Sequence, residues 1–343
     1  EADMADNTGR KRILTGIRPT GQLHIGHYVG ALENWVRLQR EYDAYFLIAD
    51  YQALGDHIDD IQLIRDSVLQ VAIDWLSVGL DPEESTFVIQ SYVPEHAELT
   101  MLLSFITPLG MLQRNPTLKA ETEQLRADQL NVGFFNYPMS QVADILLPRA
   151  DLVPVGEDQA PHIEMTREIA RKFNRLFAPV FSEPDTLIGR IPRLSGTDGS
   201  PKMSKSRGNT ILLGDDPETV RKKVMSMFTD PTRLRATDPG HVEGNPVFEY
   251  HDAFNPDTAE VDDFKDRYRA GNVGDVDVKK SLVIAMNNFL DPIREKRAYY
   301  EAHINEVEEA LMEGTRRARV TAAETMKSVR DAMKISSYTD SWK

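Results

Sequence analysis

The sequence predicts an α/β fold: a parallel β-sheet with crossover helices, followed by an all-helical C-terminal region. Segments typical of strands and of helices alternate through the first half of the chain, which is the pattern of a parallel sheet. Beyond Asp216 the strand-like segments almost disappear. The length of 343 residues is enough for two domains of about 100–200 residues each.

The first half of the chain supplies expected strands and helices in alternation. Each expected strand is a short run rich in β-branched and aromatic residues, and each expected helix carries apolar residues at helical spacing. Gly79 is a typical helix stop. In chain order these segments are a strand over 12–17, a helix over 26–40, a strand over 44–50, a helix over 61–79 and a strand over 85–91.

The middle and the end of the chain are less regular. Residues 95–150 are expected to be helical and divided by prolines, and 182–215 have the glycine, proline and serine content of a mobile loop. A strand over 151–158 leads into a helix over 159–177. The dividing prolines are Pro108, Pro116, Pro138 and Pro148, and helices of the C-terminal region are expected to begin near Pro217, Val278, Pro292 and Glu301.

Composition excludes several classes of site. The chain has no cysteine, so it has no disulfide, no thiolate metal site and no cysteine nucleophile, which agrees with a cytoplasmic protein. No window reaches the ~18 apolar residues of a membrane span, and the N-terminal EADMADNTGRKR lacks the apolar core of a secretory signal. We therefore expect no membrane partner.

The net charge of −14 argues against a protein that coats nucleic acid non-specifically. Local basic patches can still hold one folded RNA, because screening confines each field to about 10 Å. Candidate patches are KMSKSRG at 202–208, REKR at 294–297 and RRAR at 316–319, although solvated helix faces explain the last two equally well.

The stretch LHIGHYVG places His24 and His27 three residues apart, on one side of a helix start, with Gly26 between them. A metal site would need a third ligand, and the glutamate of His-Glu-x-x-His is absent. Two interpretations stay open: polar residues satisfied at a helix start, or imidazoles that handle a phosphate where free backbone N–H groups favour anions. The second interpretation fits the carboxyl end of the first strand, where ligands of α/β sheets bind.

The second candidate is PKMSKS at 201–206, in a glycine-flanked loop. A basic surface loop is the plain alternative, and the spacing of a phosphate-binding P-loop is missing. Lys202 and Lys205 on a mobile loop would suit a charge that builds up during reaction, such as departing pyrophosphate.

Together, in this order, the two stretches resemble the class I aminoacyl-tRNA synthetases, whose signature motifs are HIGH and KMSKS. Longer segments look like the tryptophanyl-tRNA synthetases of bacterial type: TGIRPTGQLHIGHYVGALENW (15–35), IADYQAL (48–54), YPMSQVADILL (137–147) and VPVGEDQAPHIEMTREIARKFN (153–174). The resemblance covers roughly residues 12–335.

The resemblance implies a Rossmann-like catalytic domain over 10–215, with a helical and dimer-forming insertion at about 95–150, and a helical anticodon-binding domain over 216–335. It implies a homodimeric ligase that joins L-tryptophan to its cognate tRNA for protein biosynthesis. The first step forms tryptophanyl-adenylate from ATP with release of pyrophosphate, and the second transfers the aminoacyl group to the 3′ terminal ribose. The tRNA would lie across both subunits.

The resemblance also assigns roles to individual residues. His24, His27, Lys202 and Lys205 would act on the phosphates of ATP, and Mg²⁺ would come with the nucleotide, held mostly by phosphate oxygens and water. Gly26 would let adenosine approach the backbone. The remaining ATP-binding positions would be Arg18, Pro19, Thr20, Gly156, Glu157, Asp158, Gln159, Ile191, Met203, Ser204 and Ser206.

The amino-acid pocket can be argued on the residues. Tyr137, Gln141 and Asp144 are spaced four and three apart, on one face of one short helix. In the family this aspartate accepts the indole N–H, which is a pure donor, and such a site rejects phenylalanine because the acceptor would be left unpaired. Local capping or pairing of Asp144 is the alternative.

Two positions depart from the family pattern. Gln141 stands where many bacterial tryptophanyl enzymes have methionine, and tyrosyl enzymes use a Tyr…Gln…Asp set, so tyrosine remains an alternative substrate. Gln52, also expected at the pocket, stands where many relatives have histidine.

Two functions outside the ligases also stay open: a small-molecule nucleotidyltransferase with the same histidine motif, and a non-enzymatic RNA-binding module. The helical C-terminal region argues against the nucleotidyltransferase, because such an enzyme needs no anticodon-reading bundle. The intact histidines and lysines of the two motifs argue against the non-enzymatic module.

Overall fold

The computed structural model describes residues 9–124, 130–155, 160–188, 193–233, 235 and 237–336. Its centre is a five-stranded parallel sheet in the order β3-β2-β1-β4-β5. The strands are β1 (Arg12–Ile17), β2 (Asp43–Ile48), β3 (Ser85–Ile89), β4 (Leu152–Val155) and β5 (Asp185–Ile188).

Alternate residues of the strands enter two separate hydrophobic cores. Ile13 of β1 and Phe46 of β2 belong to the first core, and their neighbours Leu14 and Tyr45 belong to the second, as the two-residue period of a strand requires. Both faces of the sheet are therefore covered, which is the normal state of a parallel sheet.

Different helices cover the two faces. The first core takes α2 (Glu33–Glu41) and α4 (Ile61–Val78), whose Trp35 and Trp75 pack on Phe46. The second core takes α5 (Glu95–Ile106), α8 (Val132–Leu146) and α9 (Ala160–Leu176). Shorter elements are α1 (Ile25–His27), α3 (Asp50–His57), η2 (Gln90–Tyr92), α6 (Leu109–Arg114), α7 (Pro116–Gln124) and η5 (Lys205–Arg207).

The strand order places a switch point at the centre of the sheet. The chain runs from β1 outward to β2 and β3, and then returns to the other side of β1 with β4 and β5. The loops that leave β1 and β4 therefore diverge at their carboxyl ends, which is where ligands of open α/β sheets bind.

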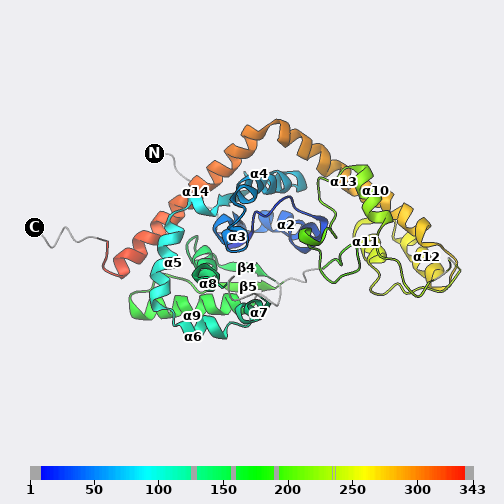
Figure 1. Ribbon diagram of the computed structural model, residues 1–343. Helices are drawn as coiled ribbons and strands as arrows, with labels where there is room; N and C mark the ends of the chain where they lie inside the picture. The colour runs from blue at the N-terminus through cyan, green and yellow to red at the C-terminus, as the bar shows by residue number, and fades with distance from the viewer. Residues whose placement is uncertain are drawn as a thin grey trace, which may run out of the picture.

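The described part of the C-terminal region contains helices and loops but no strand. It comprises α10 (Pro217–Met225), α11 (Pro246–Phe254), α12 (Thr258–Arg269), α13 (Asp275–Ala302) and α14 (Ile304–Ala332). Figure 1 shows α10, α11 and α12 gathered at one end of the molecule, with α13 leading from them to α14, which crosses toward the other end. No helix in the described ranges is long and apolar enough to cross a membrane.

The last helix packs on the edge strand of the sheet. Ile89 N–H donates to Thr315 Oγ1 at 3.0 Å. A Cβ at Gly314 would lie 2.3 Å from the carbonyl oxygen of Phe87, so only glycine permits this approach. The domain boundary expected at 215/216 stays a prediction, but the last part of the C-terminal region is fixed to the sheet.

Most expected elements are confirmed, and three expectations are wrong. The segment 182–215 is not a loop throughout, because it contains strand β5, which pairs with β4. Pro138 lies inside α8 and Pro292 lies inside α13, so neither divides a helix. A proline in a helix interior costs about 3 kcal/mol, and burial of the apolar residues that follow each one offsets this cost.

The helix expected over 26–40 is present with one change. It consists of α1, a π-helical turn over Tyr28–Leu32, and α2. Such π turns are rare and occur frequently at functional sites, and this one follows His27 directly.

Candidate active site at the carboxyl edge of the sheet

The HIGH stretch begins the first helix after β1, as the sequence predicts. His24 is the N-cap of α1. The segment behind the KMSKS stretch pairs with it through the backbone: Ile25 N–H donates to Ile211 O at 3.0 Å, and Leu213 N–H donates to Leu23 O at 2.9 Å. These contacts bring together two motifs that lie far apart in the sequence.

Backbone contacts fix both imidazoles. Gly26 N–H donates to His24 Nδ1, and His24 N–H donates to His27 Nδ1, each at 3.1 Å. The ring centroids are 3.8 Å apart. Because Nδ1 is the acceptor in both rings, a neutral ring carries its proton on Nε2. Each histidine therefore presents an Nε2–H donor.

Burial and neighbouring cations keep both rings neutral. Burial, assisted by the charge of Lys205, lowers the pKa of His24 to about 4. The pKa of His27 is also well below its usual value, because of burial first and then His24, Lys205 and Lys202. At pH 7 the pair offers hydrogen-bond donors without a charge of its own.

Lys205 lies against the loop that leaves β1. Its Nζ donates to Thr20 O at 2.8 Å and to Gly21 O at 3.1 Å. Burial lowers the pKa of its ammonium group, while Asp74 opposes that shift. Lys202 is exposed. The histidines and lysines thus converge on one region, which is the expected arrangement.

Gly26 has a tighter environment than the sequence indicates. A Cβ there would lie 2.9 Å from atoms of the His24 ring and 2.9 Å from the sulfur of Met203, which is itself buried. A side chain at this position would push the two motifs apart. The glycine is therefore needed for their contact, in addition to any role in admitting a ligand.

Asn209 and Asp198 order the loop that carries the lysines, and the sequence analysis missed both. Asn209 Nδ2 donates to Asp198 Oδ1 at 3.0 Å and to Ser200 Oγ at 2.8 Å, and Ser204 N–H donates to Asn209 Oδ1 at 2.7 Å. Hydrogen bonds from Ser200 and Asn209 hold the pKa of Asp198 at about 2. The composition of 182–215 is that of a mobile loop, but this part of it is internally bonded.

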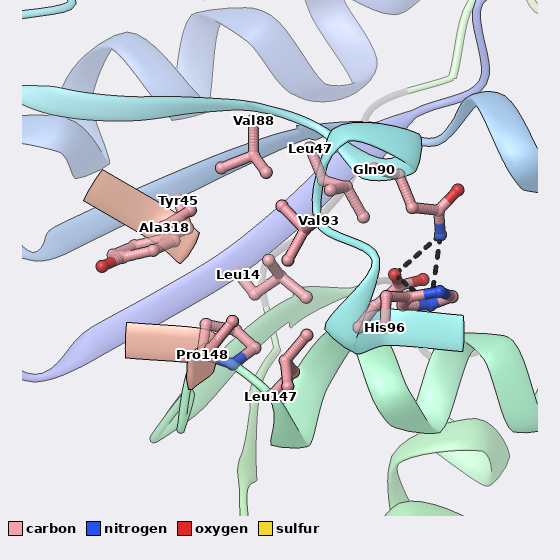
Figure 2. Close-up of a pocket in the computed structure, with 12 residues that line it drawn as sticks. Leu14, Tyr45, Leu47, Val88, Gln90, Val93, His96, Leu147, Pro148 and Ala318 are labelled. Atoms are coloured by element: carbon pink, nitrogen blue, oxygen red, sulfur yellow. Dashed lines mark hydrogen bonds and ion pairs between the residues drawn. The ribbon is translucent and has the colours of Figure 1, made fainter. Parts of the chain in front are cut away.

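The other half of the site surrounds Asp144, which is 7 % exposed. Gln52 Nε2 donates to Oδ2 at 2.7 Å, and Gln90 Nε2 donates to Oδ1 at 2.7 Å. His96 Nε2 lies 2.9 Å from Oδ1. Figure 2 shows Gln90 and His96 at the polar end of a cavity whose other walls are apolar. These partners come from α3, η2 and α5, so Asp144 is not a local cap.

Gln90 and His96 are the functional residues that sequence reasoning missed in this half. The sequence shows only a polar residue, Gln90, directly after β3 and a histidine, His96, at the start of α5. Neither residue alone indicates a binding site. Burial lowers the pKa of His96, but the charge and hydrogen bond of Asp144 and the Ser140 carbonyl outweigh it, so the net shift is upward. His96 Nδ1 is buried without a hydrogen-bond partner.

Some of the remaining predicted site residues lie where the sequence analysis expects them, and others lie outside the described part of the chain. Tyr137 and Gln141 share α8 with Asp144, as expected, and the ring of Tyr137 packs on Phe134 and His162. Arg18, Pro19 and Thr20 follow β1 at the carboxyl edge. Ser204 and Ser206 hydrogen-bond each other at 2.8 Å. The predicted positions Gly156, Glu157, Asp158, Gln159 and Ile191 lie outside the described residues.

The two basic runs near the C-terminus make tertiary contacts. Arg294 Nε donates to Asp215 O at 2.7 Å, and Arg317 donates to the carbonyls of Pro82 and Ser85 at 2.8 and 2.9 Å. Arg297 is buried. Much of the positive charge in these runs is therefore used to join helices to the sheet region.

Comparison with known proteins agrees with this geometry. The family model of the class I tRNA synthetases (W and Y) matches residues 6–291. A tryptophan–tRNA ligase of Treponema pallidum is 48% identical over 327 residues, covering 95% of this chain and 97% of that protein. One from Clostridium longisporum is 49% identical over 329 residues, covering 94% and 96%.

A solved structure of a tryptophanyl-tRNA synthetase is also similar to this chain. Tryptophanyl-tRNA synthetase from Campylobacter jejuni, complexed with ADP and tryptophan, superimposes with a TM-score of 0.83 at 34% identity, covering 94% of this chain and 99% of that one. The chain belongs to the class I aminoacyl-tRNA synthetases of the tryptophan and tyrosine group.

Proposed function

We propose that the chain ligates L-tryptophan to its cognate tRNA in two steps. The observation that carries the proposal is the contact of Lys205 with the loop just before the HIGH stretch, at the same sheet edge as the buried carboxylate of Asp144. The first feature suits the phosphates of ATP, and the second suits a substrate with one N–H donor. The ligases named above support the choice of substrate.

In the first step the carboxylate oxygen of tryptophan attacks the α-phosphorus of ATP. A new oxygen–phosphorus bond forms, the bond to the β-phosphate bridge breaks, and pyrophosphate leaves. The Nε2–H donors of His24 and His27 and the ammonium groups of Lys202 and Lys205 stabilise charge on the phosphate oxygens. No side chain acts as a nucleophile, which agrees with a chain that lacks cysteine.

In the second step the ribose hydroxyl at the 3′ end of the tRNA attacks the carbonyl of the adenylate, and AMP leaves. Here the protein positions two substrates, and the rate comes largely from their orientation. The residues that read the tRNA are not assigned.

Mg²⁺ would accompany the nucleotide and neutralise charge on the triphosphate. Among the described residues, no group of three or more histidine and acidic side chains is placed to hold a metal ion. We propose an ion held by phosphate oxygens and water, a mode of binding that is common for Mg²⁺. The residues of this chain would then act on the phosphates themselves.

Asp144 would select the amino acid. Its oxygens already accept from Gln52, Gln90 and His96. A carboxylate has about four lone-pair positions, so one remains for the indole N–H. Phenylalanine would leave that position unpaired in a buried site, which is costly.

We further propose a homodimer with a cytoplasmic location. Exposed apolar side chains lie on α5 and α6, in the segment expected to form dimers: Met101, Phe105 and Leu109 are 59%, 74% and 61% exposed. A surface of this kind is typical of a protein interface. Sedimentation of wild type and of Phe105→Asp tests the point, and a monomeric wild-type protein would refute it.

Exchange of pyrophosphate into ATP, measured with each of the twenty amino acids in turn, tests the function. We expect exchange with tryptophan and with no other amino acid at comparable concentration. Exchange with tyrosine would assign the alternative substrate. Exchange without any amino acid, or none at all, would refute a ligase of this group.

A further inference from the structure

A buried carboxylate on α4 holds the backbone directly before His24. Asp74 is 0% exposed, and its Oδ2 accepts the N–H of Leu23 at 2.7 Å. Leu23 is the residue that enters the N-cap of α1. The position of His24 therefore depends on a side chain from a helix on one face of the sheet.

The other carboxylate oxygen of Asp74 pairs with Arg297 of α13, which is 3% exposed. The guanidinium has two more acceptors, Gln70 Oε1 and Glu301 Oε1, both at 2.9 Å. A Cβ at Gly214 would lie 2.9 Å from Arg297 Nε, so the glycine leaves room for the guanidinium. A helix of the C-terminal region thus closes the network around Asp74.

The same network holds a second residue of the loop. Gln22 Nε2 donates to Gln70 Oε1 at 3.0 Å, and Gln70 also accepts from Arg297. Both residues that precede His24 are therefore tied to α4, one by its side chain and one by its backbone. Arg297 contacts the two α4 side chains that do this.

Asp74 also acts on the lysine side of the site. Burial raises its pKa to about 6, against the lowering effects of Arg297, the Leu23 N–H and Lys205. At neutral pH the carboxylate is therefore ionised, and its charge favours the charged form of Lys205. One side chain thus contacts the residue just before the first signature motif and interacts electrostatically with a lysine of the second.

A stabilising role alone does not explain this arrangement. Desolvation of two buried charges largely cancels their attraction, so a buried ion pair is weak evidence for stability. What the pair adds is a fixed geometry: the planar guanidinium sets the carboxylate, and the carboxylate sets the backbone of Leu23.

We propose that Asp74 is a positioning residue for adenylate formation, and that Arg297 keeps its carboxylate aimed at Leu23 so that His24 and His27 present their Nε2–H groups to ATP. The proposal rests on the proposed function. It makes the first step depend on α13, although α13 contributes no residue to the catalytic set named above.

The test compares Asp74→Asn, Arg297→Met and Arg297→Lys in the full-length protein. Tryptophan-dependent exchange gives kcat and the KM values for ATP and tryptophan, and chemical denaturation gives the stability of each variant. We expect Asp74→Asn and Arg297→Met to lower kcat/KM for ATP by about 10- to 100-fold, the range expected when reacting groups are misplaced by up to 1 Å. KM for tryptophan should change less than about twofold, since the Asp144 region is untouched.

Arg297→Lys should recover only part of the loss, because the ammonium group restores the charge but not the planar set of donors that reaches Asp74, Gln70 and Glu301 together. The double variant Asp74→Asn/Arg297→Met should be no slower than the slower single variant, since both act through one contact. Arg294→Met is the matched control: this arginine is on the same helix and contacts Asp215 O, and its replacement should leave the ATP kinetics unchanged.

The proposal is overturned if the variants lose stability but keep wild-type kcat/KM for ATP under conditions where they are folded. It is also overturned if Arg297→Lys is as slow as Arg297→Met, or if tryptophan and ATP kinetics fall together. If Arg297→Met does not fold, the kcat/KM values of Asp74→Asn and Arg297→Lys for ATP test the proposal. Wild-type protein without tryptophan-dependent exchange would refute the proposed function instead, so the two failures are distinguishable.

Discussion

The two halves of the site are built by different means. At the nucleotide half, contacts within a few residues set the histidines: the rings accept N–H groups of Gly26 and His24. At the tryptophan half, Asp144 is held by Gln52 and Gln90, which lie 92 and 54 positions away in the sequence. In the first half the ring orientations are set locally, although Asp74 and Arg297 hold the backbone that precedes them. In the second half the side-chain donors to the carboxylate also come from distant parts of the sequence.

The difference explains which half a short motif can reveal. A capping pattern such as His-Ile-Gly-His sets the orientation of its own two rings through hydrogen bonds within the pattern. A buried carboxylate in VADIL specifies nothing until the sheet and its covering helices bring donors to it. Substitutions should therefore affect one half without the other, and the largest effect is expected at Lys205.

Lys205→Ala should disable the nucleotide half alone. Removing one preorganised cation typically costs about 10²–10³ in rate, so tryptophan-dependent exchange should fall by that factor. Tryptophan affinity, measured by calorimetry, should stay within about twofold.

Arg207→Ala supplies the control, because Arg207 is an exposed cation of the same loop and has no proposed role in adenylate formation. It should keep wild-type exchange. Equal losses in both variants would mean that the general positive charge of the loop matters and not the position of Lys205.

Asp144→Asn should disable the tryptophan half alone. The amide keeps the shape but offers fewer acceptor positions among three donors, and a hydrogen bond to a charged group contributes about 1.5–3 kcal/mol. KM for tryptophan should rise roughly 10- to 100-fold, while KM for ATP is nearly unchanged. Unaltered discrimination against phenylalanine would contradict the acceptor role.

His96→Gln probes the support of Asp144. Glutamine keeps an N–H donor but cannot carry the positive charge that the raised pKa of His96 favours. KM for tryptophan should therefore rise by roughly fivefold, less than for Asp144→Asn. Steady-state exchange at several tryptophan concentrations measures this. An increase in KM for ATP, with none for tryptophan, would contradict a role of His96 in supporting Asp144.

The histidines of the nucleotide half should have a small effect on stability. The pKa of His24 is about 4 in the folded protein and about 6.5 in the unfolded chain. Between these values the unfolded state binds more protons, so the free energy of unfolding falls as the pH falls. His24 alone should account for roughly 0.5–1 kcal/mol between pH 7 and pH 6.

Urea denaturation at the two pH values checks this contribution. His24→Asn is a suitable comparison, because asparagine is a good N-cap residue that does not titrate. The variant should lose less stability than wild type over the same interval. An equal loss would show that the imidazole of His24 is not held neutral by the fold.

The sequence predicts features that depend on neighbouring residues better than features that depend on distant contacts. The strand over 12–17 and the helix end at Gly79 could be predicted, because local pattern sets each of them. The meeting of the two signature motifs is expected from the family resemblance, since they lie far apart in the sequence. Strand β5 could not be predicted, because only four residues, Asp185–Ile188, pair with β4 inside a glycine- and proline-rich segment.

Arg297 gives the clearest case of what the sequence hides. In REKR it belongs to a run of charges typical of a solvated or nucleic-acid-binding face. The chain continues as one helix through Pro292, and that helix carries Arg297 inward to Asp74, 223 positions away in the sequence. Spacing within the run holds no information about that contact.

The central claim is that His24, His27, Lys202 and Lys205 act on one triphosphate. A crystal structure with a non-hydrolysable ATP analogue, Mg²⁺ and tryptophan tests it most directly. We predict both Nε2 atoms and both Nζ atoms within about 3.2 Å of phosphate oxygens of one nucleotide, with Lys205 released from Thr20 O or Gly21 O. A nucleotide whose phosphates lie elsewhere, with Lys205 still on both carbonyls, would contradict the claim.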